Sequence, residues 1–60
     1  MNRPKAIKFI YHAIRDFGYG LARAVEIYEY LSGGGVMPVT DDMIFLYLIN
    51  SGFYRDNDIV

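Results

Sequence analysis

The sequence predicts an all-α fold in which residues 1–60 form a single compact three-helix domain, with a glycine-rich loop and an extended strap between the second and third helices. Three observations lead to this prediction. Apolar residues recur every three or four positions in the first half of the chain, which is the spacing of amphipathic helices. Glycines cluster at 18–20 and 33–35, where helices would end. The sequence TDD at 40–42, just before the apolar run MIFLYLI, is typical of a helix start.

The first helix is predicted over residues 4–17. Asn2 can cap its amino end, and Pro4 suits its first turn. The apolar positions that should face the core are Ile7, Ile10, Ile14 and Phe17. The opposite stripe consists of Lys5, Lys8, His12 and Arg15. The exposed face of this helix is therefore expected to be cationic along its whole length.

The second helix is predicted over residues 21–32, after glycines that supply the left-handed backbone of a helix ending. Its expected core face consists of Leu21, Ala24, Val25, Tyr28 and Leu31. Ile27 and Tyr30 lie beside this stripe and predict a second, partly buried face. The loop 33–40 follows, and its three glycines indicate either mobility or close backbone approach. The segment 36–39 is held extended ahead of its proline and is expected to pack across the helices.

The third helix is predicted over residues 41–51. Thr40 can accept hydrogen bonds from the backbone amides of the first turn. At the other end, Gly52 allows Phe53 to fold back on Leu48 in a Schellman arrangement. The alternative is two helices plus a small β-hairpin of VMPV and MIFLYL, because Ile, Phe and Tyr also favour strands. The tail 55–60 is expected to be loosely held.

Length and composition limit what can hold the chain together. A chain of 60 residues buries only about 60% of the surface that its unfolded form exposes. It has no cysteine, which excludes disulfides and thiolate metal sites and fits a cytoplasmic protein. With 53% hydrophobic and 17% aromatic residues, dense apolar packing or association with another chain is expected instead. No apolar run reaches the roughly 18 to 20 residues of a transmembrane segment.

Charge is unevenly distributed along the chain. The net charge is -1, but residues 1–23 carry a balance of +4 and residues 24–60 a balance of -5. Such asymmetry can serve docking within the chain, head-to-tail association or binding of a charged partner.

The sequence gives no support for catalysis, a metal or a cofactor. His12 is the only imidazole, and it lacks a nucleophile at a defined spacing and companion metal ligands. The paired carboxylates also lack the context of a catalytic or calcium site. These pairs are Glu26 with Glu29, Asp41 with Asp42, and Asp56 with Asp58. We therefore expect a non-enzymatic protein without cofactors.

The apolar run 43–49 predicts how the protein acts. A helix that is apolar all round needs cover on every side, and two short amphipathic helices cannot provide it. The exposed remainder would be rich in the residues that protein interfaces favour. We expect a protein-binding module, acting as an inhibitor or adaptor of the kind a virus or mobile element encodes, either as a homodimer or on a larger target. The predicted interface consists of Tyr28, Tyr30, Met43, Phe45, Tyr47, Phe53 and Tyr54.

The alternative is a small DNA-binding regulator, because helix, glycine-containing turn and helix is the outline of a helix-turn-helix. Its contacts to phosphate, or to an acidic partner, would come from the basic face of the first helix. The residues are Lys5, Lys8, His12 and Arg15. Glu26 and Glu29 on the second helix would repel phosphates, so nucleic acid is the second choice of partner.

Overall fold

The computed structural model describes residues 2–54, and the predicted tail at 55–60 lies outside this part of the chain. The described residues contain no strand, so the predicted all-α three-helix fold is confirmed and the hairpin alternative is wrong. The elements are α1 (Arg3–Ile14), a 3₁₀ turn η1 (Arg15–Phe17), α2 (Leu21–Leu31) and α3 (Asp41–Asn50).

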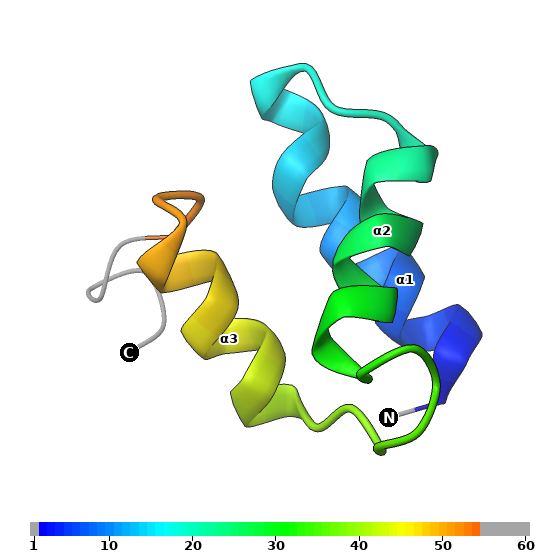
Figure 1. Cartoon of the computed structure of the whole chain (residues 1–60). Coiled ribbons are helices and arrows are strands. Elements are labelled where there is room, and N and C mark those ends of the chain that lie inside the picture. The colour runs from blue at the N-terminus through cyan, green and yellow to red at the C-terminus, as the bar shows by residue number, and fades with distance from the viewer. Residues whose placement is uncertain (1, 55–60) are drawn as a thin grey trace.

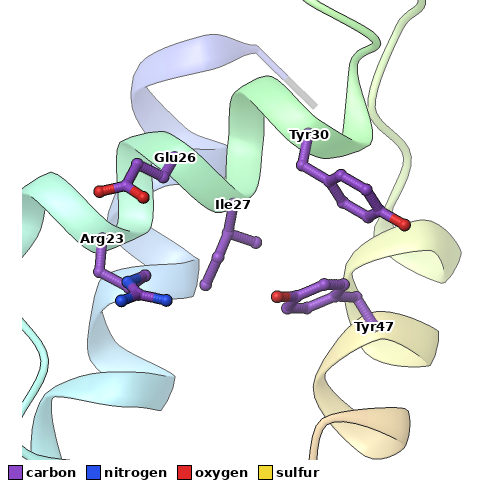
Figure 2. Close-up of a pocket in the computed structure, with 5 residues that line it drawn as sticks. All are labelled: Arg23, Glu26, Ile27, Tyr30 and Tyr47. Atoms are coloured by element: carbon purple, nitrogen blue, oxygen red, sulfur yellow. The ribbon is translucent and has the colours of Figure 1, made fainter.

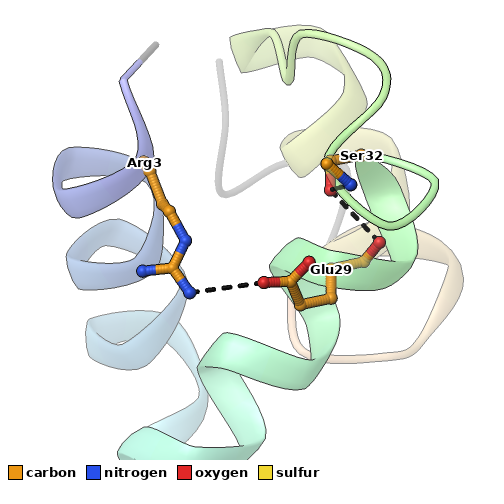
Figure 3. Close-up of polar contacts among 4 residues, drawn as sticks. Arg3, Glu29 and Ser32 are labelled. Atoms are coloured by element: carbon orange, nitrogen blue, oxygen red, sulfur yellow. Dashed lines mark hydrogen bonds and ion pairs between the residues drawn. The ribbon is translucent and has the colours of Figure 1, made fainter.

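The three helices alternate in direction along the chain (Figure 1). The start of α1 lies beside the end of α2, where an Arg3 guanidinium nitrogen lies 3.3 Å from Oε1 of Glu29 (Figure 3). α3 runs in the same sense as α1. Two edge-to-face aromatic pairs between these segments show this: Phe9 with Phe45 at 5.5 Å and Phe17 with Phe53 at 5.2 Å between ring centroids.

The core lies where the three helices meet. Alanines on the facing sides of α1 and α2 are buried, and their small side chains allow the two backbones to approach closely. α3 adds two fully buried aliphatic side chains, Ile44 and Leu48. Within residues 2–54, the buried core consists of Ala6, Ile7, Ile10, Ala13, Ile14, Ala24, Ile27, Val39, Ile44 and Leu48.

The observed core differs from the predicted core on both sides of the connection between α1 and α2. α1 ends at Ile14, and the tighter η1 turn changes the rotation per residue. Phe17 is consequently 56% exposed rather than in the core. In α2, Leu21 is exposed and Ile27 is only 4% exposed. Two apolar stripes overlap on this helix, and the prediction chose the wrong one as its centre.

The loop after α2 is organised around Ser32, whose side chain is fully buried. Its hydroxyl donates to the Glu29 carbonyl (Figure 3) and accepts from the Gly35 amide. Gly33, Gly34 and Gly35 all have positive φ, at 63°, 80° and 94°. The glycines thus form a hydrogen-bonded left-handed turn, for which residues without a side chain are suited.

The segment 36–39 packs on the core only through Val39. Val36, Met37 and Pro38 are exposed, so the prediction of a strap across the helices is wrong for these three residues. The left-handed turn directs the chain outward after Ser32, and the chain returns to the core only just before α3 begins.

Both ends of α3 follow the prediction. The Thr40 hydroxyl accepts from the Met43 amide at 3.3 Å, and the Thr40 amide donates to the Met43 sulfur at 3.4 Å. At the other end, the Phe53 amide donates to the Leu48 carbonyl at 2.9 Å, and Gly52 has a φ of 86°. These bonds confirm the predicted cap and the Schellman ending.

The glycine turn should be sensitive to a single methyl group. Gly34→Ala places a β-carbon on a left-handed residue and should lower the free energy of unfolding by roughly 1–2 kcal/mol. Gly34→Asn should lose less, because Asn tolerates this conformation better. Gly20→Ser is the matched control, since Gly20 has a φ of -96° and caps α2 without a side-chain hydrogen bond. The control should leave stability unchanged or raise it. Urea denaturation followed by circular dichroism measures all three, and equal losses for Gly34→Ala and the control would contradict this account.

Candidate functional site

Among residues 2–54, α3 is covered on one side only. Ile44 and Leu48 point into the core and are fully buried. Because successive residues turn by about 100° in an α-helix, Leu46 lies on the opposite side, where it is 60% exposed. The remaining apolar residues of the run are half-buried and flank these two sides; they are Met43, Phe45, Tyr47 and Ile49.

An open pocket of about 210 Å³ lies at the seam between α2 and α3. Its lining residues are Arg23, Glu26, Ile27, Tyr30 and Tyr47 (Figure 2). Ile27 extends from α2 into the space between the charged residues on one side and the two tyrosines on the other (Figure 2). The rings of Tyr30 and Tyr47 meet at 5.9 Å, and Tyr30 is 73% exposed. We call the pocket together with Leu46, the residue before Tyr47, the α2–α3 surface.

The two charged residues of the pocket have no ion-pair partner among residues 2–54, although they are three positions apart on one helix. The Arg23 guanidinium lies over the Tyr19 ring instead, 5.1 Å from its centroid. Glu26 is exposed. Both charges are therefore open to a partner molecule.

The predicted interface residues fall into two groups. Tyr30 and Tyr47 lie together at the pocket. The other five are half-buried and make contacts within the chain; they are Tyr28, Met43, Phe45, Phe53 and Tyr54.

The contacts of this second group hold the helices together. Phe45 lies between Phe9 of α1 and Tyr54, with the Tyr54 ring at 6.3 Å. Phe53 meets the rings of Phe17 and Tyr19. The segment 41–54 is thus attached to α1, to η1 and to Tyr19 by aromatic edges, as well as by the buried aliphatic residues of α3.

The predicted basic face is exposed, at Lys5, Lys8 and His12 of α1 and at Arg15 of η1. The Arg15 Nε lies 3.8 Å from Oδ1 of Asp16, and the His12 ring lies against Tyr11 at 5.8 Å. Lys5 and Lys8 form no ion pair within residues 2–54. This face belongs to α1 and η1, whereas the pocket is formed by α2 and α3, so the chain has two separate candidate surfaces.

The predicted interface did not include Leu46, Arg23 or Ile27, although Ile27 was expected on a partly buried face of its helix. An apolar run has no polar face that marks its outer side, so the exposure of Leu46 follows only from the burial of Ile44 and Leu48. Arg23 lies outside the predicted core face of its helix, where the sequence does not distinguish it from an ordinary solvated charge.

Comparisons with known proteins found no match: no family model, curated protein or solved structure matches the chain.

Within residues 2–54, no three His, Asp or Glu side chains lie close enough together to bind a metal ion. None of the described helices combines the length and apolar character needed to cross a bilayer.

Two leucines on α3 distinguish surface from core. Leu46→Ala should change the free energy of unfolding by less than about 0.5 kcal/mol, because the side chain is exposed. Leu48→Ala should lose roughly 2–5 kcal/mol, because it opens a cavity in the core. Thermal and urea denaturation measure both variants. Comparable losses at the two positions would show that Leu46 supports the fold and is not a free surface residue.

Proposed function

We propose that the protein is a small non-enzymatic binding module that acts as an inhibitor or adaptor by docking its α2–α3 surface on another protein. One observation carries the proposal: Tyr30 and Leu46 remain 73% and 60% exposed in a chain of only 60 residues. Fully burying a large apolar side chain contributes roughly 1.5–3 kcal/mol. The fold does not bury these two side chains, so this free energy would become available when a partner protein covers them.

The shape of the pocket favours a macromolecular partner over a small ligand. Pockets that enclose small molecules usually measure roughly 300–1,000 Å³, whereas this one measures about 210 Å³ and is open. Its apolar floor, aromatic wall and charged rim correspond to the anchors and rim of protein interfaces. Tyrosine suits such a surface because its ring tolerates water when the partner is absent.

The basic face of α1 supports a second candidate, a DNA-binding regulator. Lys5 and Lys8 are exposed and have no acidic partner within residues 2–54, as expected of side chains that contact phosphate. Two features weigh against this candidate. The net charge is -1. In addition, α2, which would be the recognition helix, exposes Glu26, and this carboxylate would repel the DNA phosphates.

Site-specific photo-crosslinking separates the two candidates. A photoreactive residue at position 46 should yield adducts of discrete mass with a different protein in cells, and the same residue at position 12 should not. Tyr47→Glu, which places a charge beside the pocket, should abolish the adducts at position 46. Lys8→Glu is the control for a charge change elsewhere and should leave them unchanged.

Two outcomes would overturn the proposal. Protein adducts of equal yield at positions 12 and 46 would remove the preference for the α2–α3 surface. Adducts with nucleic acid at position 12, lost in Lys8→Glu and weakened steeply by salt, would instead support the DNA-binding candidate.

A further inference from the structure

We infer that one partner of this surface is a second copy of the chain, bound by antiparallel pairing of two α2 helices about a two-fold axis. The inference rests on the proposed function in using the same surface. It is based on a stripe of four exposed residues along α2, which we call the α2 stripe. The stripe consists of Tyr19, Arg23, Glu26 and Tyr30.

The members of the α2 stripe lie on one face of the helix. Their spacings of four, three and four residues repeat the period that aligns side chains along a helix. Tyr19 precedes the first residue of α2, but its ring lies beneath the Arg23 guanidinium. Glu26 and Tyr30 line the same pocket as Arg23. The contacts therefore place all four side chains on the side of α2 that faces solvent and the α3 seam.

Along the α2 stripe, the residues are aromatic, charged, charged and aromatic in either direction. The two central charges are opposite in sign. An antiparallel copy therefore sets Arg23 opposite Glu26 of the partner subunit, and Tyr19 opposite Tyr30 of the partner subunit. The two-fold axis makes each of these contacts twice. Such self-complementarity is what a symmetric dimer interface requires.

The chain leaves the charges of the α2 stripe free for this role. Arg3 and Glu29 pair within the chain at 3.3 Å, and Arg15 and Asp16 at 3.8 Å. Within residues 2–54, neither Arg23 nor Glu26 forms an ion pair. An arginine fork fits a carboxylate of a neighbouring chain well.

The residues around the α2 stripe also fit a partner helix. Ala22, exposed beside it, has a side chain small enough to let a second helix approach. The open pocket next to it has an apolar floor, Ile27, and an aromatic wall, Tyr30 and Tyr47. A second α2 lying along this seam would cover both.

Charge reversal at the two central positions tests the geometry. Arg23→Glu and Glu26→Arg each place like charges opposite one another, so each variant alone should dimerise roughly ten- to a hundredfold more weakly than wild type. An equal mixture of the two should restore a dimer that contains one chain of each kind, because both charge contacts are then attractive. The chain that carries both reversals should dimerise like wild type. Sedimentation equilibrium and native mass spectrometry measure the affinities and the composition.

Controls exclude other causes. Circular dichroism should show that all variants fold, since both positions are exposed. Lys8→Glu, on the exposed face of α1, should leave the dimer unchanged. A wild-type chain that stays monomeric over the whole concentration series overturns the inference, and so does a mixture that dimerises no better than its components.

The outcomes distinguish this inference from the proposed function. If position 46 forms adducts with a different protein and the wild-type chain does not dimerise, the proposed function stands and the dimer is rejected. If the chain forms a charge-dependent dimer and no such adducts are found, the dimer stands and the inhibitor or adaptor role is rejected.

Discussion

The burial of Ile44 and Leu48 against α1 and α2 is the contact on which the rest of the structure depends. α3 is apolar all round, so its sequence alone allows any side to face inward. Once these two residues are fully buried, helical geometry places every other residue of the run. Phe45 reaches α1, Tyr47 reaches α2, and Leu46 points to solvent. A single packing choice thus produces both the fold and its exposed apolar surface.

The parts of the fold that depend on local chemistry could be predicted from the sequence. The Thr40 cap and the glycine ending with Phe53 involve residues within a few positions of each other, and their chemistry specifies the geometry. The misassigned residues depend on distant packing. Whether Leu21 or Ile27 faces the core is decided by where α1 and α3 lie against α2, because both positions fit an amphipathic stripe. The same holds for Val36, which local angles alone leave free to point either way.

The candidate site was predicted in part, for a similar reason. Aromatic enrichment marked Tyr30 and Tyr47 as interface residues, and the structure brings their rings together. Composition cannot separate an aromatic residue that faces solvent from one that holds two helices together, as Phe45 does with Phe9. Arg23 was missed because an exposed charge is ordinarily solvated, and its position becomes informative only with Glu26 beside it at the pocket, where neither side chain forms an ion pair within residues 2–54.

Charges at the centre of an interface act differently from the apolar residues around them. An ion pair that leaves water loses much of its attraction to desolvation, so its net contribution to affinity is small, whereas mismatched charges are strongly unfavourable. In the antiparallel arrangement, Arg23 and Glu26 would therefore fix the orientation of the two α2 helices. The affinity would come from the aromatic ends of the α2 stripe and from cover over Ile27. With that division of roles, a surface with a charged centre would still act as an apolar docking surface, because the charges would select the partner and the rings beside them would hold it.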